Sequence, residues 1–174
     1  MNHLLYLFLF SHTANANPLV QYAQGDFSCR DSEDEIKNKE ERALKKTLAS
    51  YPSLIRPIIA SSLRGKFHMC QKYKLSTDQD EMMLKCDERP TVAVQLNGTP
   101  TQYITEKGTM SVVAEVQNNT ITQDFQAKSG GLLIQYAFYD KRLEVTKTLY
   151  SPYLRESLTL QTDYLLQESL YTQQ

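Results

Sequence analysis

Residues able to do chemistry are sparse in this chain of 174 residues. Two of its three histidines, His3 and His12, lie near the start, which leaves His68 as the one imidazole further along. His68 alternates with Phe67 and Met69, a pattern that predicts a solvent-facing side chain on a strand. The sequence contains no phosphate loop, dinucleotide fingerprint, Gly-x-Ser-x-Gly elbow or His-Glu-x-x-His pair. We therefore expect no catalytic site, no cofactor and no enzymatic activity.

The remaining route to catalysis uses carboxylates alone. Carboxylates such as Asp124 and Asp163 are the candidates. They would need raised pKa values to act as an acid and a base. If both lie on the outside of the fold, this alternative loses its basis.

The three cysteines permit one intramolecular disulfide. Cys70 and Cys86 are symmetric about Asp78, so a hairpin that turns there would place them opposite each other. That register, however, puts Tyr73 and Leu75 on the face opposite Met82 and Leu84. We predict a Cys70–Cys86 bond, with a β-bulge that would reconcile it with the apolar register; the alternative is that Cys29 bridges to one of the pair. The long intervals between the cysteines lack the close pairing of zinc sites, so no metal site is expected.

The N-terminus indicates the compartment. Residues 4–10 form an unbroken apolar run that is too short to span a bilayer as a helix, and Ala14-Asn15-Ala16 follows it after a polar stretch. This pattern is typical of a signal peptide over residues 1–16, although no Lys or Arg precedes the apolar run. We expect a secreted or periplasmic protein with no transmembrane segment. The alternative is that residues 4–10 form a buried first strand.

Composition excludes other classes of partner. The 19 basic and 20 acidic residues nearly balance, so there is no net positive field to attract nucleic acid. The length suits one domain, and 41% hydrophobic with 22% charged residues is typical of a globular protein.

Helical signals come first. Residues 17–31 show no period and are expected to be a loose lead-in, followed by a helical segment over 32–64. Ser32-Glu33-Asp34-Glu35 has the form of a capping box, and apolar residues then recur at helical spacing until Pro52. Ser53 is expected to cap a second helix, with Pro57 in its first turn and Gly65 as its stop.

The period changes from helical to two at Phe67. Antiparallel structure is expected over residues 65–174, in the same single domain as the helices. The predicted strands are 67–75, 82–86, 91–96, 101–105, 110–117, 120–127, 131–139, 142–149 and 157–166. Short turns between them predict an antiparallel meander. The chain is thus of the α+β class, mainly β, with two N-terminal helices and an 8–9-stranded barrel. The alternative is a curved open sheet that wraps the helices, as in cystatin-like folds.

Gly65-Lys66-Phe67 resembles the entry to the first strand in the lipocalin and calycin families, where a glycine, a variable residue and an aromatic stand in this order. Most of those families have Trp at the position of Phe67. The resemblance implies that this aromatic packs against a late arginine, for which Arg155 is the nearest candidate. It also implies a barrel that holds a small apolar molecule, with Tyr73, Tyr136, Phe138 and Tyr164 facing the cavity. The same four aromatics would equally suit a filled core.

Two functions follow from these patterns. The first is an exported protein that binds a small hydrophobic ligand, of lipocalin-like type. The second is a secreted or periplasmic protein-interaction or inhibitor module, in which the N-terminal helices or the strand links contact a protein partner.

Overall fold

The computed structural model describes residues 24–78, 80–105 and 108–167, which form two helices and ten strands. The signal peptide expected over residues 1–16 lies outside the described residues. In chain order the elements are β1 (Gly25–Cys29), α2 (Glu33–Leu48), α3 (Arg56–Leu63), β2 (Lys72–Asp78), β3 (Glu81–Cys86), β4 (Val92–Gln95), β5 (Thr101–Thr105), β6 (Gly108–Gln117), β7 (Thr120–Ala127), β8 (Gly130–Tyr139), β9 (Arg142–Tyr150) and β10 (Leu158–Leu166).

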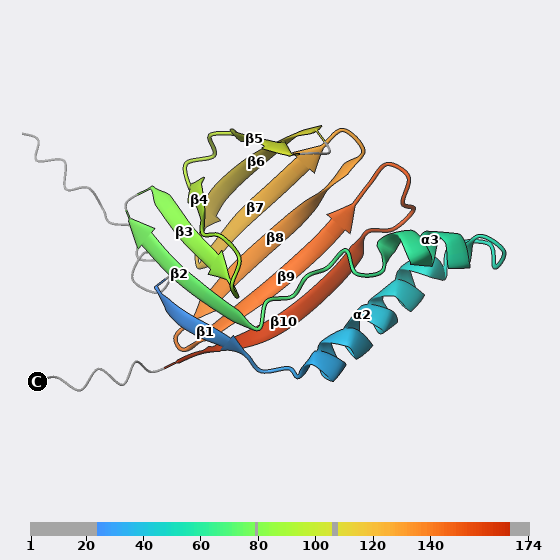
Figure 1. Cartoon of the computed structure of the whole chain (residues 1–174), viewed down its shortest axis with the longest axis horizontal. Coiled ribbons are helices and arrows are strands. Elements are labelled where there is room, and N and C mark those ends of the chain that lie inside the picture. Colours follow the sequence, from blue (N-terminus) through green and yellow to red (C-terminus); the bar gives the residue numbers. More distant parts are fainter. Residues whose placement is uncertain (1–23, 79, 106–107, 168–174) are drawn as a thin grey trace, which may run out of the picture.

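All ten strands belong to one antiparallel sheet, in the order β4-β3-β2-β1-β10-β9-β8-β7-β6-β5. The sheet curls until its two ends approach, as Figure 1 shows. The segment after β4 contacts β6 there: Asn97 bridges to Glu115, and the Gly98 amide donates to the Ala114 carbonyl at 2.9 Å. The predicted class, two helices followed by an antiparallel meander that forms a barrel, is confirmed, and the barrel is nearly closed.

The strand that the sequence did not predict is β1, in the segment expected to be a loose lead-in. It lies between β10 and β2 and thus joins the two ends of the meander. Phe27, its one fully buried residue, is paired with Tyr73 and Leu166. A five-residue strand with a single buried side chain shows no period of two, so this strand depends on its pairing partners.

The first helix begins where the sequence predicts, but the second does not. Ser32 caps α2 in a complete capping box with Glu35, as predicted. The prediction that Ser53 caps the next helix is wrong, because α3 begins at Arg56, with Ile55 at the cap position and without a side-chain cap. A start at Ser53 would require the amide of Pro57 to bond to the Ser53 carbonyl, and proline has no amide hydrogen. The observed start places Pro57 in the first turn.

The strand predicted over 67–75 begins only at Lys72, and residues 66–70 have no regular structure. Gly65-Lys66-Phe67 therefore does not open a strand.

In the β2–β3 pair Tyr73 lies opposite Cys86, and Leu75 lies opposite Leu84. The apolar residues thus share a face, and Cys70 reaches Cys86 from outside the ladder to form the disulfide. This arrangement resolves the conflict between disulfide and register without a bridge from Cys29, which is free.

The helices pack against one end of the barrel interior. Leu44 of α2 and Leu63 of α3 form a cluster with Phe67, Met69 and the inward-facing residues Leu158 and Leu160 of β10. In Figure 1 α2 runs beside β10, with α3 beyond it. Arg155 does not fill the role that the resemblance implied for it: its guanidinium lies 5.3 Å from the ring centre of Tyr51. Within the described residues, no helix is long and apolar enough to cross a membrane.

Candidate ligand-binding cavity

The barrel interior contains a pocket of about 240 Å³. Strands on both sides of the curled sheet and the irregular segment before β2 contribute to it. Its lining consists of Lys66, His68, Cys70, Tyr73, Leu84, Cys86, Arg89, Pro90, Val92, Gln123, Phe125, Leu132, Ile134, Tyr136 and Lys147. Most of the wall is apolar, while a few polar groups converge on it, as is usual in small-molecule sites.

Lys147 is the most unusual residue of this pocket. It occupies an inward-facing position of β9, in phase with Leu143 and Val145, and only 6% of it is exposed. Its ammonium group donates a hydrogen bond to the carbonyl of His68. Burial, together with the nearby charge of Arg89, lowers the pKa of Lys147 to about 8. Buried lysines are rare unless an anion accompanies them, and the pocket lining contains no Asp or Glu.

Gln123 supplies a second buried polar group. It lies on the inward face of β7, 1% exposed, and its Oε1 accepts a hydrogen bond of 3.2 Å from the hydroxyl of Tyr136. Its Nε2 has no hydrogen-bond partner among the described residues. A buried amide hydrogen without a partner costs free energy, so this atom is available to a ligand acceptor or a water molecule.

The four aromatics named from the sequence divide into two groups. Tyr73 and Tyr136 line the pocket and meet edge to face, with ring centres 5.9 Å apart. Phe138 and Tyr164 do not line it. Phe138 packs against Phe27, and Tyr164 packs against Tyr73 while its hydroxyl donates to the Cys70 carbonyl at 2.9 Å. Burial raises the pKa of Tyr73 and Tyr136 well above the usual value, so both remain neutral hydroxyls.

The two carboxylates considered for catalysis face away from the barrel interior. Gln123 points inward, so its neighbour Asp124 points outward, where it accepts hydrogen bonds from Tyr150 and Gln126. Asp163 likewise lies between the inward-facing Thr162 and Tyr164. The carboxylate alternative therefore has no support at the pocket.

Reasoning from the sequence missed Lys147 and Gln123, although both leave a readable signal. Each is a polar residue at an inward position of an otherwise apolar alternation: Lys147 follows Leu143 and Val145, and Gln123 lies between Ile121 and Phe125. His68, expected on a strand face, instead lies in the irregular segment, half exposed, with its Nε2 3.4 Å from Asp87 Oδ2.

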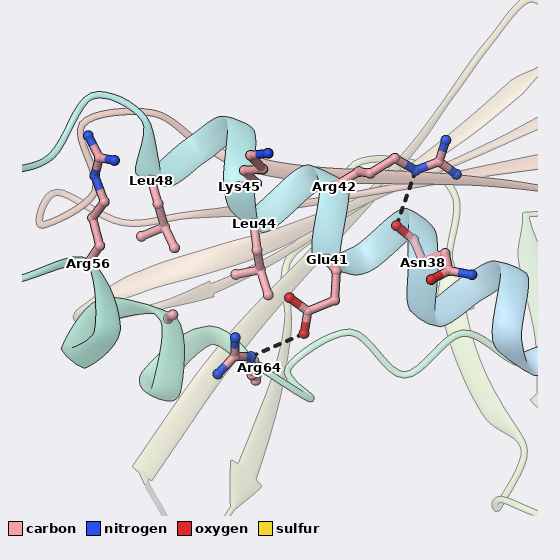
Figure 2. A pocket seen from close by; sticks show the side chains of 9 residues that line it. Asn38, Glu41, Arg42, Leu44, Lys45, Leu48, Arg56 and Arg64 are labelled. Atoms are coloured by element: carbon pink, nitrogen blue, oxygen red, sulfur yellow. Dashed lines mark hydrogen bonds and ion pairs between the residues drawn. The ribbon is translucent and has the colours of Figure 1, made fainter. Parts of the chain in front are cut away.

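A second hollow, about 760 Å³, lies outside the barrel between α2 and α3 (Figure 2). Four basic side chains line it: Arg42, Lys45, Arg56 and Arg64. The one carboxylate in its lining, Glu41, already pairs with Arg64 at 3.2 Å. Leu54 and Ile58, which are 88% and 69% exposed, do not line this hollow.

No family model matches the sequence, and no curated protein matches it. Solved structures do match this chain in fold. A fatty-acid-binding protein from the brain of Drosophila melanogaster is 16% identical, with a TM-score of 0.50 over 83% of this chain and 98% of that chain. A Schistosoma mansoni fatty-acid-binding protein in complex with arachidonic acid is 13% identical, with a TM-score of 0.52 over 85% and 98%.

A secretory abundant heat soluble protein from Ramazzottius varieornatus is 10% identical, with a TM-score of 0.51 over 83% and 94%. Identities this low show the fold alone. The broader calycin expectation is therefore confirmed at the level of fold, whereas the lipocalin family itself is not. The chain shares the barrel fold of the fatty-acid-binding proteins.

Proposed function

We propose that this protein binds a small amphipathic molecule inside its barrel, with the apolar part against the pocket wall and an anionic or polar group at Lys147. The observation that carries the proposal is the buried ammonium of Lys147, which faces a pocket without a carboxylate. A ligand anion would supply a counter-charge inside the pocket, where the lining has none, and the Gln123 amide, which has no partner among the described residues, would donate to the same polar group.

The apolar wall supports the same proposal. Leu84, Val92, Phe125, Leu132 and Ile134 line one continuous pocket beside the polar groups. Apolar surface of this kind favours hydrocarbon by about 25 cal/mol per Å² buried. The shared fold is consistent with it, since one structure of this fold was solved with a fatty acid bound.

The test is displacement of a fluorescent fatty acid by decanoate from the full chain, in parent and Lys147→Met protein. A charge-assisted hydrogen bond contributes about 1.5–3 kcal/mol, so the variant should bind decanoate roughly 10–100-fold more weakly. Lys128→Met, which removes an exposed lysine outside the pocket, is the matched control and should bind like the parent. Equal affinity of the parent and Lys147→Met for decanoate would contradict the proposed role of Lys147, and absence of binding by the parent would contradict the function.

A second candidate function is supported by the α2–α3 groove. Its four basic side chains suit a protein partner with an acidic surface. Charge reversal of Arg42 and Lys45 to Glu should then abolish capture of such a partner from secreted material, while Lys128→Glu should not. Equal capture by both variants would remove this candidate.

We further propose that the protein is exported and that residues 1–16 are removed. The apolar run at 4–10 and the small residues around Ala16 support this proposal. Mass spectrometry of the protein from the native host should give a chain that begins at Asn17; an intact Met1 end would contradict export by this route.

A further inference from the structure

Four side chains with metal-binding atoms meet at the edge of the pocket. They are His68, Cys70, Cys86 and Asp87, and their ligand atoms all lie within 4.8 Å of one another. His68 Nε2 and Cys86 Sγ are 3.4 and 4.0 Å from Asp87 Oδ2. In a tetrahedral zinc site with metal–ligand bonds of about 2.0–2.3 Å, ligand atoms stand roughly 3.3–3.8 Å apart. The contacts of Asp87 with His68 and Cys86 are close to these dimensions, whereas the two sulfurs are bonded to each other and would have to separate before both could bind a metal ion.

The backbone around the cluster is fixed by contacts other than the disulfide. Asp87 has a left-handed backbone with φ of 50°, and its Oδ1 accepts hydrogen bonds from the amides of Gln71 and Lys72 at 2.9 and 2.8 Å. These bonds orient the carboxylate and leave Oδ2 toward His68. The carbonyl of Cys70 accepts from Tyr164, and the carbonyl of His68 accepts from Lys147. The segment that carries His68 and Cys70 is thus held in place from the barrel side.

The local charge also suits a thiolate-rich centre. A divalent ion bound by two thiolates, one carboxylate and a neutral imidazole has a net charge of −1. The cations of Lys147 and Arg89 lie nearby, because both side chains line the same pocket as His68, Cys70 and Cys86, and Lys147 donates to the His68 carbonyl. Access from solvent is provided by His68 and Asp87, whose side chains are 46% and 28% exposed, whereas Cys70 is buried.

We propose that the dithiol form of this protein binds one zinc-like divalent ion through His68 Nε2, Asp87 Oδ2 and the two sulfurs of Cys70 and Cys86. A thiol reductant breaks the sulfur–sulfur bond with two electrons, the two cysteines take up two protons, and the reductant leaves as its own disulfide. Metal binding then releases the two thiol protons as the two metal–sulfur bonds form. The oxidised form offers only His68 and Asp87, too few ligands for the same centre.

The consequence is a cross-link that persists in both redox states. The disulfide joins the irregular segment at 66–70 to the end of β3 in the oxidised protein. In the reduced protein the metal makes the same connection, so the pocket edge formed by His68, Cys70 and Cys86 is retained. This inference goes beyond the proposed function: His68, Cys70 and Cys86 line the edge of the same pocket, but binding of the metal ion is measured without the hydrophobic ligand.

The test is a titration of the full chain with Co²⁺, in a Cys29→Ser background that removes the free thiol. After reduction by a phosphine and removal of oxygen, one equivalent of Co²⁺ should produce thiolate-to-cobalt charge transfer and the intense visible bands of tetrahedral cobalt. Zn²⁺ should bleach both. The oxidised protein should show neither signal.

Variants separate ligation from simple unfolding. His68→Gln and Asp87→Asn should weaken Co²⁺ binding at least about tenfold, since even residues that only support ligands contribute that much. Glu88→Gln is the matched control, because Glu88 is fully exposed next to Asp87 and outside the cluster. Circular dichroism of each reduced variant verifies folding. Octahedral cobalt without charge transfer in the reduced parent, or unchanged affinity in both His68→Gln and Asp87→Asn, would overturn the inference.

Discussion

Two regions of the barrel interior differ in how their inward-facing residues are used. Around Phe27, Phe138, Leu143 and Tyr164 the interior is packed, and the hydroxyl of Tyr164 has a carbonyl partner. Around Gln123 and Lys147 the interior is hollow, with a buried amide nitrogen that has no partner among the described residues and a buried ammonium without a carboxylate in the pocket lining. The same period-two alternation builds both regions. The difference shows that the same alternation can build a packed core in one region and a hollow lined by long polar side chains, Gln123 and Lys147, in another.

The largest contrast is expected from truncating one leucine in each region. Leu143→Ala removes a side chain with no exposed area from the packed region and should cost about 2–5 kcal/mol of unfolding free energy. Leu132→Ala enlarges an existing pocket and should cost less, roughly 1–2 kcal/mol, because Leu132 is only partly buried. Urea unfolding of both variants measures the difference; equal costs would mean that the hollow region is packed as tightly as the other.

The next effect is a pH dependence specific to Lys147. The pKa of Lys147 is about 8 in the folded protein, compared with the usual lysine value of 10.5, which we take for the unfolded chain. Between these two pH values the unfolded chain binds more protons than the folded protein, so the free energy of unfolding rises with pH. Over that window the parent should gain up to about 3 kcal/mol relative to Lys147→Met. Tyrosine ionisation affects both proteins alike, so the difference isolates the lysine. Parallel stability curves from pH 7 to 10 would show that Lys147 is not desolvated.

The disulfide at the edge of the hollow region provides a third test. It closes a sequence separation of 16 residues, and a loop of that size contributes about 3 kcal/mol through the unfolded state. Cys86→Ser, compared with Cys29→Ser under non-reducing and metal-free conditions, should lower the unfolding free energy by about this amount. Cys29→Ser alone should change it little, since Cys29 is free. Similar losses in both variants would contradict the pairing.

The smallest effect is expected outside both regions, at the start of α2. Ser32→Ala removes the side chain that accepts from the Glu35 amide and should cost about 1 kcal/mol. Thermal unfolding followed by circular dichroism measures it. Ligand affinity should stay unchanged, because Ser32 and Glu35 do not line the pocket; an altered affinity would indicate that α2 is coupled to the barrel interior.

Much of the fold could be predicted from the sequence, because the signals were local. The capping box at Ser32 and the alternation over nine strands specify α2 and the meander. What escaped prediction depends on distant partners. The strand at Gly25–Cys29 depends on pairing with β2 and β10. In the β2–β3 pair Leu75 lies opposite Leu84, so the register follows the apolar residues and does not place the two cysteines opposite each other.

The candidate site was predictable only in part. Tyr73 and Tyr136 line the pocket, but Phe138 and Tyr164 share the same alternation and lie in the packed region. Periodicity shows which face of the sheet a side chain lies on. It does not show whether that part of the barrel interior is packed or hollow. Lys147 and Gln123 were readable as polar interruptions of an apolar face, but Thr162 interrupts the inward face of β10 in the same way and does not line the pocket.

The most direct test of the central claim is a ¹³C NMR titration of the Lys147 side chain in the free protein and with saturating decanoate. The account predicts a pKa near 8 in the free protein, because the ammonium is buried, and a higher pKa with decanoate bound, because the carboxylate favours the charged form. A pKa near 10.5 in the free protein, or one that does not change when decanoate binds, would contradict the role of Lys147 as the anchor of the ligand.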